Sequence, residues 1–309
     1  MKILITGIAG FVGSGLAKEL LGLGHDIVGV DNLSNGRIQN VPVGADFVKG
    51  DCHDFDTLKV LFEKHSFQLV YHLAGQSSGE ISFENPIYDL ESNTTSTLHL
   101  INFCKLFSVP KMIYASTMSV YGDAEELPVS ETYTNLIPKS FYAVGKLASE
   151  NYLRINSNKN FQTVALRFFN IYGPGQNLEN LKQGMVSIFL AQMIKSRTIT
   201  IKGSGERFRD FIHIKDVIEA LKALMFKDYK EDFKIYNICS GQPTKVKNLI
   251  SLLESSSSFK IKHQYTDSTP GDQFGIYGSY SAFQRDFEWL PKVSFDDGIK
   301  DLVKLYEKD

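Results

Sequence analysis

The first half of the chain alternates short apolar, β-branched runs with longer segments in which apolar residues recur every three or four positions. Three of these longer segments predict helices, over Phe11–Leu23, Thr94–Phe107 and Phe141–Ile155. Six short runs predict strands, at Lys2–Thr6, Ile27–Val30, Asp46–Val48, Leu69–Leu73, Lys111–Ser116 and Thr163–Phe168. Strands that alternate with helices in this way are typical of a parallel sheet, because parallel strands need crossover connections.

We therefore predict an α/β fold, with a Rossmann-like, doubly wound parallel sheet and a smaller C-terminal lobe that binds substrate. The alternation loosens after about residue 170, where Gly173-Pro174-Gly175 and Gly203-Ser204-Gly205 interrupt it. The expected division is a cofactor-binding domain over residues 1–170 and a substrate lobe over 171–309. Residues 213–240 are expected to pack back onto the first domain.

Composition narrows the class of protein. The 309 residues include 33 basic and 35 acidic side chains, and 43% are hydrophobic, which is typical of a globular protein. A net charge of −2 gives no general attraction for nucleic acid or an anionic membrane. Three scattered cysteines, Cys52, Cys104 and Cys239, fit a reducing compartment, and no apolar run is long enough to span a membrane. We expect a cytoplasmic protein that binds neither nucleic acid nor membrane.

A glycine-rich turn follows the first predicted strand and precedes the first predicted helix. Gly7, Gly10 and Gly13 have the spacing G-x-x-G-x-x-G. Such glycines permit a tight turn, close approach of a pyrophosphate to backbone N–H groups, and close packing of helix on sheet. A glycine triplet alone also fits a plain turn. Its position between strand and helix favours dinucleotide binding.

Two carboxylates at strand ends support this interpretation. Asp31 ends the second predicted strand, 18 residues after Gly13, where a carboxylate accepts hydrogen bonds from the adenosine ribose and repels the extra phosphate of NADP. Asp51 ends the next strand and is expected to bind the adenine amino group. An aspartate at a strand end is otherwise an ordinary turn residue. Together the two residues favour NAD over NADP.

The candidate reactive groups are a phenol and an ammonium on one helix face. Tyr142 and Lys146 stand at i and i+4, and Ser116-Thr117 closes the preceding strand, at the end where α/β active sites form. A free phenol has a pKa of about 10. We expect Lys146 and a nicotinamide ring to lower it, so that Tyr142 accepts a proton from a sugar hydroxyl that Thr117, and Ser116 with it, binds. The alternative is a surface Tyr–Lys pair without function.

With these motifs the chain resembles the extended short-chain dehydrogenases/reductases of the nucleotide-sugar epimerase/dehydratase family. The resemblance runs from end to end. Its motifs are Thr6-Gly7-x-x-Gly10-x-x-Gly13, Asp31-Asn32-Leu33, Gly50-Asp51, His72-Leu73-Ala74-Gly75, Asn93, Ser116-Thr117, Val120-Tyr121-Gly122, Tyr142 with Lys146, the run from Leu166 to Pro174, Arg209-Asp210-Phe211-Ile212-His213 with Asp216-Val217, and Pro270-Gly271-Asp272.

The resemblance implies NAD as cofactor and a nucleotide-diphosphate sugar as substrate. Further residues at the NAD site would be Phe11, Val12, Asn32, Asn35, Cys52, Leu73, Ala74, Gly75, Asn93 and Phe169, beside Ser116, Tyr142 and Lys146. Substrate-binding residues would be Thr117, Asn170, Arg209 and Asp272. The helices over 94–107 and 141–155 match those that form a four-helix bundle in family dimers, which implies a homodimer. Their apolar faces equally fit an internal core.

The resemblance also narrows the reaction. Sugar 4,6-dehydratases carry Asp-Glu directly after the strand-end Thr, where this chain has Met118 and Ser119. Epimerase-reductases use an added Cys and His pair, but Cys104 and Cys239 stand in apolar segments. We therefore expect oxidoreduction at C4, by a 4-epimerase with a transient 4-ketone. The alternative is a 4-dehydrogenase that releases the keto sugar, for example from a GDP-heptose or hexose used in surface polysaccharide.

Three further expectations concern what the chain lacks. A non-catalytic NAD-sensing protein on the same fold usually lacks the Tyr/Lys pair, so the pair argues against that class. Many family members carry a diphosphate-binding Arg where this chain has Thr269, and Arg207 and Lys202 are candidates for compensation. The seven histidines are dispersed, which predicts no metal site.

Overall fold

The computed structural model describes residues 1–227, 231–268 and 273–307, which belong to two compact units. The first unit comprises Met1–Val120, Ser140–Arg167 and Ile218–Tyr236. The second comprises Tyr121–Lys139, Phe168–Val217 and Asn237–Asp309. The chain therefore crosses from one unit to the other several times, whereas a division at residue 170 would need one crossing. Residues 121–139, for example, belong to the second unit.

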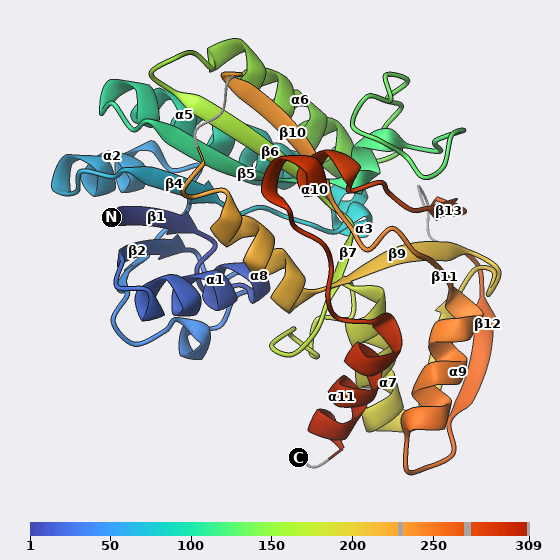
Figure 1. Ribbon diagram of the computed structural model, residues 1–309. Coiled ribbons are helices and arrows are strands. Elements are labelled where there is room, and N and C mark those ends of the chain that lie inside the picture. The colour runs from blue at the N-terminus through green and yellow to red at the C-terminus, as the bar shows by residue number, and fades with distance from the viewer. Residues whose placement is uncertain (228–230, 269–272, 308–309) are drawn as a thin grey trace. The chain divides into compact units, whose positions relative to one another are not determined.

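The first unit is built on a seven-stranded sheet (Figure 1). Its strands, in spatial order, are β10 (Phe233–Ile238), β6 (Gln162–Phe168), β5 (Lys111–Thr117), β4 (Leu69–His72), β1 (Lys2–Thr6), β2 (Asp26–Asp31) and β3 (Asp46–Lys49). The pairs from β3 to β5 are parallel. Each of the six predicted strands is present, with ends within one residue of the prediction. The predicted Rossmann-like α/β fold is confirmed.

The strand order places the candidate site. Chain order runs outward from β1 in both directions, because β1 pairs with β2 on one side and with β4 on the other. Such a switch point opens a crevice at the carboxyl ends of the two central strands, where doubly wound proteins bind their ligands. The glycine turn after β1 and the segment after β4 both lie at this edge.

Helices cover both faces of this sheet (Figure 1). One face carries α1 (Phe11–Gly22) and α8 (Ile214–Ala223), and the other carries α2 (Phe55–Lys64), α5 (Ser96–Leu106) and α6 (Phe141–Asn156). Leu16 and Leu20 of α1 are buried, but Leu23 is 54% exposed. Leu23, the last residue of the predicted helix, is exposed because α1 ends at Gly22 and the chain turns away at Gly24, whose φ is 80°.

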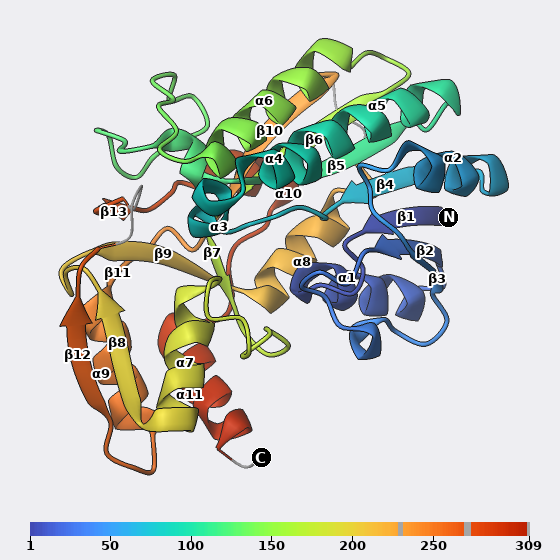
Figure 2. The ribbon, with the colours of Figure 1, turned by 180° about the vertical axis from the view of Figure 1, so that it is seen from behind.

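Two short helices lead into α5. They are α3 (Gly79–Glu84) and α4 (Pro86–Leu90), and α4 passes through a π-helical turn at Glu91–Thr95 into α5. Figure 2 shows α4, α5 and α6 in one layer. The predicted helix over 94–107 therefore begins inside the π-turn. A π-turn holds one residue more than an α-turn, which shifts the helical period.

The second unit has a core of its own. A four-stranded sheet joins β11 (Pro243–Lys245), β9 (Phe208–His213), β13 (Gly275–Ile276) and β7 (Asn170–Tyr172), and β12 (Lys262–Thr266) pairs in parallel with β8 (Thr198–Lys202). Its other elements are α7 (Met185–Ser196), α9 (Val246–Ser256), α10 (Ser281–Phe287) and α11 (Phe295–Tyr306). Leu190, Ile201, Leu249 and Leu302 are among the buried residues of this core.

Within the described ranges, no helix combines the length and the apolar character that a membrane crossing requires.

His72 joins three elements of the first unit through buried hydroxyl groups. Thr97 donates its hydroxyl hydrogen to the carbonyl oxygen of Asn93 at 2.7 Å, so the contact of 3.1 Å between Thr97 Oγ1 and His72 Nε2 needs a hydrogen on Nε2. Nδ1 then accepts from Thr6 Oγ1 at 2.8 Å, and Thr6 in turn accepts from the Ala74 N–H. Burial lowers the pKa of His72 to about 3. This chain of hydrogen bonds therefore requires the neutral ring.

We expect His72 to make the protein less stable in acid. The unfolded chain binds a proton at this ring below about pH 6.5, whereas the folded protein does not until about pH 3. The free energy of unfolding should therefore fall by up to about 1.4 kcal/mol for each pH unit across that window. Urea unfolding at several pH values measures the slope, which should be shallower in His72→Gln. The exposed His263→Gln is the control, and an unchanged slope in His72→Gln would contradict the assignment.

Candidate active site

The glycine turn allows α1 to approach β1 closely. A Cβ atom on Gly13 would lie 2.1 Å from the carbonyl oxygen of Gly7, and one on Gly7, whose φ is 73°, would lie 2.9 Å from the Ala74 nitrogen. Both positions therefore require glycine. No side chain caps α1 at Gly10, and its first turn holds no acidic residue. The first N–H groups of the helix consequently face the turn without a side-chain acceptor.

Asp31 orders the backbone beside this turn. Its Oδ2 accepts from the Ala9 N–H at 3.0 Å, and its Oδ1 accepts from the Leu33 N–H at 2.8 Å. Leu33 is held in the left-handed region, with φ at 61°. Burial raises the pKa of Asp31, while these two hydrogen bonds lower it. Each oxygen keeps a second lone pair for a hydroxyl donor.

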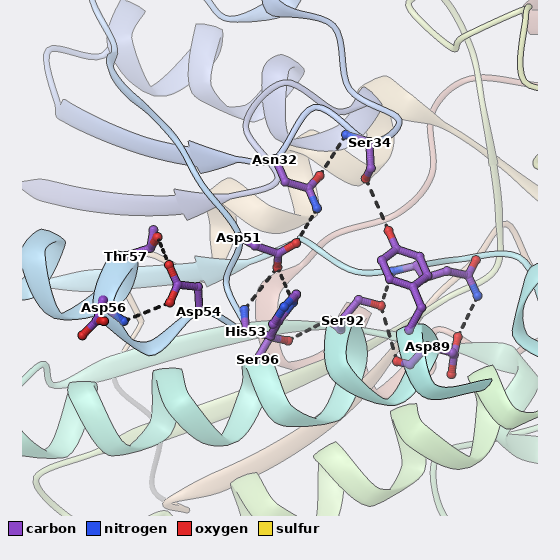
Figure 3. A network of polar contacts seen from close by, with 12 residues as sticks. Asn32, Ser34, Asp51, His53, Asp54, Asp56, Thr57, Asp89, Ser92 and Ser96 are labelled. Carbon is purple, nitrogen blue, oxygen red and sulfur yellow. Dashed lines mark hydrogen bonds and ion pairs between the residues drawn. The ribbon is translucent and has the colours of Figure 1, made fainter. Parts of the chain in front are cut away.

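Asp51 is the centre of a polar network at the ends of β2 and β3 (Figure 3). Its Oδ2 accepts from Asn32 Nδ2 at 2.6 Å, and His53 Nδ1 lies 2.8 Å from its Oδ1. The Ser34 N–H donates to Asn32 Oδ1 at 2.9 Å, which links the network to the loop after β2. Asn35 lies exposed in this loop. The structure thus brings Asn32 to Asp51.

Cys52 follows Asp51 but its side chain belongs to the core. It is 5% exposed among the buried residues between the sheet and α2, and burial raises the pKa of its thiol. Cys104 and Cys239 are also buried. None of the three thiols is therefore placed for chemistry at the glycine turn, and only the backbone of Cys52 is available to a ligand there.

The segment Leu73–Gly75 follows β4 and lies against the glycine turn. Gly75 has a φ of 155°, and a Cβ there would lie 2.4 Å from Asn93 Oδ1 and 3.2 Å from Lys146 Nζ. Asn93 is fully buried in the π-turn, and its Oδ1 has no hydrogen-bond partner among the described residues. An unpartnered buried oxygen is costly, so this atom and the space at Gly75 fit a ligand that donates a hydrogen bond.

Tyr142 and Lys146 lie on the α6 face that meets β5. The 4% exposed Lys146 donates from Nζ to the carbonyl oxygen of Ala115 at 2.8 Å. Nζ also lies 4.7 Å from the ring centroid of Tyr114 and 6.0 Å from that of Tyr142. Burial lowers the pKa of Lys146 to about 8, and the nearby carboxylates of Asp89 and Glu150 raise it.

The pKa of Tyr142 differs from the expectation. Burial raises it to about 12, a hydrogen bond with Thr117 lowers it, and the charge of Asp89 raises it. The lowering that we expected from Lys146 is not found, and the loss of solvent around the phenol has the largest effect on this pKa. A further positive charge near the hydroxyl is needed to bring this pKa toward neutrality.

Ser116 lies in a buried network that the sequence analysis did not assign. Its Oγ donates to Glu150 Oε1 at 2.5 Å, and Arg167 binds both oxygens of Glu150, at 3.0 and 2.7 Å. Glu150 and Arg167 are each 2% exposed. The hydroxyl hydrogen of Ser116 is thus held by Glu150. The sequence does contain a sign of this network. Glu150 follows Lys146 by four residues on the same helix face, and Arg167 interrupts an apolar strand.

Thr117 ends β5 beside Tyr142. Its Oγ1 donates to Ser119 Oγ at 3.2 Å and accepts from the Ser119 N–H at the same distance. Met118 and Ser119 form the helical turn that follows, and Met118 is 9% exposed. Neither side chain is a carboxylic acid, so neither can act as the acid or base of a dehydratase at this position.

The second unit holds the other predicted residues. Phe169 is 3% exposed, and Asn170 Nδ2 donates to the carbonyl oxygen of Asp210 at 3.0 Å. Arg209 donates to the carbonyl oxygens of Phe208 at 2.8 Å and of Gln273 at 2.6 Å. Burial lowers the pKa of Arg209 to about 10. Asp272 and Thr269 lie outside the described residues.

The two candidates for compensation also lie in the second unit. Arg207 is 7% exposed and donates to the carbonyl oxygens of Ser204, at 3.1 Å, and of Lys202. Its guanidinium is therefore held in the backbone loop between β8 and β9. Over the described parts of the chain, no group of three or more His, Cys, Asp or Glu residues is arranged to hold a metal ion.

Comparison with known proteins identifies this arrangement. Residues 3–239 match the model of the NAD-dependent epimerase/dehydratase family. This chain belongs to that family. It is 32% identical to a putative UDP-glucose 4-epimerase of Methanocaldococcus jannaschii, over 97% of each chain.

Solved members of the family have the same fold. A UDP-glucose 4-epimerase of Thermotoga maritima, solved with UDP-glucose, superposes with a TM-score of 0.94 at 32% identity, over 100% of this chain and 99% of that one. A UDP-glucuronic acid 4-epimerase of Bacillus cereus, in complex with UDP-glucuronic acid and NAD, gives a TM-score of 0.89 at 28% identity, over 99% and 100%. The chain is therefore similar to these family members along its whole length.

The residues of the first unit fit NAD, the cofactor after which the family is named. Gly7 and Gly13 keep the α1 N-terminus open toward the turn, and no acidic side chain of its first turn opposes a diphosphate. The second fit is at Asn93, whose Oδ1 has no partner beside Gly75. A dinucleotide supplies the acceptor that the first place needs, its diphosphate, and can supply a hydrogen-bond donor for the second.

We expect Gly13→Ala to damage both stability and NAD binding. The added methyl group would overlap the Gly7 carbonyl, which forces α1 away from β1 at a cost of about 1–3 kcal/mol. The displaced N–H groups should weaken NAD binding at least about tenfold. Thermal unfolding and calorimetric titration with NAD⁺ measure the two effects.

Gly22→Ala is the matched control on the same helix. A Cβ at Gly22 meets no atom within 4 Å, so this variant should keep its NAD affinity and gain a few tenths of a kcal/mol in stability. Equal NAD affinities in the two variants would show that the turn does not hold the diphosphate.

Proposed function

We propose that this chain is an NAD-dependent nucleotide-sugar 4-epimerase whose substrate is a UDP-hexose. The observation that carries the proposal is the meeting of Tyr142, Lys146 and Thr117 at the carboxyl end of β5, beside the glycine turn. Full-length similarity to UDP-glucose and UDP-glucuronate 4-epimerases supports C4 chemistry and a UDP carrier.

The cofactor would be held by the first unit. The N–H groups that begin α1 would bind its diphosphate, Asp31 its adenosine ribose, and Asp51 with Asn32 its adenine end. Asn93 and Lys146 would bind at the nicotinamide end, around Gly75. When bound, NAD supplies the acceptor and then the donor of the C4 hydride.

Tyr142 would move the proton. As the C4–H hydrogen departs with its electron pair, the phenolate oxygen of Tyr142 takes the proton of the 4-hydroxyl group, and a 4-ketone forms. Return of the hydride to the opposite face of C4, with the same proton from Tyr142, gives the inverted alcohol. Lys146 and the positive nicotinamide ring would stabilise the phenolate against the burial that raises its pKa. Thr117 would donate a hydrogen bond to the sugar oxygen.

The second unit would supply the sugar-nucleotide contacts. Arg209, held by backbone carbonyl groups, and Asn170 are proposed to bind the substrate diphosphate or its neighbours, and Arg207 is a candidate for further positive charge. Cytoplasmic location and a part in polysaccharide synthesis stay predictions.

Turnover of a panel of sugar nucleotides tests this proposal. The protein is incubated with NAD⁺ and with UDP-, GDP- and dTDP-hexoses, and the products are analysed by mass and by proton NMR at C4. We expect a UDP-hexose to keep its mass and to invert at C4. Loss of two hydrogens, with NADH formed in equal amount, would instead identify a 4-dehydrogenase. Loss of water would contradict the exclusion of dehydratase chemistry.

Tyr142→Phe is the control for the same assay. The variant keeps the ring but loses the proton acceptor, so kcat should fall at least about a hundredfold while NAD⁺ affinity changes little. A variant with wild-type turnover would rule out Tyr142 as the base. Inactivity of the wild-type chain on every sugar, with NAD⁺ bound, would favour the non-catalytic NAD-sensing alternative.

We further propose that two copies of the chain pair through α4 and α6. Ile87 is 63% exposed, Leu90 49% and Val144 53%, and the exposed rings of Phe83 and Phe141 contact each other edge to face at 5.5 Å. In contrast, Ile101 and Cys104 of α5 and Leu153 of α6 are buried within the unit. α6 thus buries Leu153 in the internal core and leaves Val144 exposed, on the same layer as the exposed Ile87 and Leu90 of α4.

Sedimentation velocity tests the pairing. We expect a species of twice the 34.7 kDa chain mass, which Val144→Asp should convert to the monomer by placing a charge in the apolar interface. Val43→Asp, at a fully exposed position outside α4 and α6, is the control and should remain dimeric. A monomeric wild type at micromolar concentration would refute the pairing.

A further inference from the structure

Asp89 is a buried carboxylate for which the mechanism above has no role. It lies on α4 with 1% of its surface exposed, and its Oδ1 accepts from Gln76 Nε2 at 2.6 Å and from Asn93 Nδ2 at 3.1 Å. Its Oδ2 accepts no hydrogen bond from the described residues. Two neutral amides on one oxygen do not offset the cost of burying a full negative charge, so a cation is expected close by.

Lys146 supplies that cation. The Asp89 carboxylate packs on α6 at Gly145, the residue before Lys146, where a Cβ atom would lie 3.7 Å from Asp89 Oδ2. Among the charges that keep Lys146 protonated against burial, Asp89 has the largest effect. Lys146 Nζ gives one of its three hydrogens to the Ala115 carbonyl oxygen. Two hydrogens of Nζ remain, and Nζ borders the position at Gly75 that Asn93 Oδ1 also borders.

Asn93 connects the two charges. Its Nδ2 donates to the Gln76 carbonyl oxygen at 2.9 Å and to Asp89 Oδ1, so both amide hydrogens are used. This fixes the orientation of the amide and leaves Asn93 Oδ1 beside the position at Gly75 that Lys146 Nζ also borders. An uncharged partner at position 89 would let the amide turn over and present N–H groups to an ammonium.

We propose that Asp89 is a positioning residue for Lys146: it holds the Asn93 amide with its oxygen toward the ammonium, and it is the counter-ion that keeps this ammonium charged. The inference deepens the proposed function and rests on it, because there a charged Lys146 stabilises the phenolate of Tyr142 against burial and against the charge of Asp89, both of which raise the pKa of Tyr142. Asp89 itself touches neither proton nor sugar.

The surroundings of Lys146 contain other ionisable groups on each packed element. His72 lies on β4, Tyr114 on β5, and Tyr142 and Glu150 on α6. His72 is neutral above about pH 3, and burial raises the pKa of Tyr114 beyond any working pH. Glu150 is bound by Arg167 at both oxygens. Among the described residues, Asp89 is thus the carboxylate beside Lys146 that is in no salt bridge with another cation.

Direct titration of Lys146 tests the inference. The protein is labelled with [13Cε]lysine, and the Lys146 resonance is assigned by its loss in Lys146→Arg. We expect its titration midpoint to move down by about one pH unit in Asp89→Asn. Asp89→Glu, which restores the charge, should recover most of this shift. The alkaline limb of the kcat–pH profile should move to lower pH by the same amount, because Lys146 loses its proton earlier.

Glu84→Gln is the matched control, since it removes an exposed carboxylate of the neighbouring helix α3. This variant should leave both the titration midpoint of Lys146 and the alkaline limb of the kcat–pH profile unchanged. A wild-type midpoint in Asp89→Asn, or an equal shift in Glu84→Gln, would overturn the inference.

The titration also separates this inference from the proposed function. It needs no substrate, so a shifted midpoint in a protein that turns over no sugar nucleotide would support the role of Asp89 and reject the 4-epimerase assignment. Normal turnover with an unshifted midpoint would support the 4-epimerase assignment and reject the role of Asp89.

Discussion

The burial of one ammonium group, that of Lys146, constrains the structure around the candidate site. Removing an isolated charge from water costs several kcal/mol unless nearby groups compensate for it. Here the compensation comes from the Ala115 carbonyl oxygen, the face of the Tyr114 ring and the carboxylate of Asp89. These groups belong to β5 and α4, while Lys146 belongs to α6. The three elements must therefore meet at one point, and small residues such as Gly145 allow them to do so.

The same requirement explains the balance of buried charge near Lys146. Two cations, Lys146 and Arg167, are matched by two anions, Asp89 and Glu150, all of them almost fully buried. His72, a neighbour of Lys146, is kept neutral because burial, and after it the charge of Lys146, lowers the pKa of its ring. A group of buried charges that sums to zero avoids the penalty of a net charge in a medium of low dielectric constant. Loss of any one member leaves its partner uncompensated.

Much of the first unit follows from local pattern, because buried parallel strands are continuous apolar runs. The glycine turn, Asp31, and Tyr142 with Lys146 are likewise visible as motifs, since their spacing is fixed within one strand, turn or helix. Asp89 and Arg167 were not predicted as site residues, because Gln76 and Lys146 beside Asp89, and Glu150 beside Arg167, lie on other segments that the fold brings to them. The same reason limits the second unit, where β9 pairs with β7, β11 and β13 across long stretches of chain.

The π-turn at Glu91–Thr95 makes the geometry of the site depend on the number of residues between α4 and α5. Successive α-helical residues are about 100° apart around the axis, so one extra residue puts α4 and α5 out of phase by about that angle. Asp89 before the turn then faces α6, while Thr97 after it faces His72. Loss of a single residue from this turn, whatever its type, would rotate one of these contacts away from its partner. Substitutions within the turn keep this phase, whereas insertions and deletions change it.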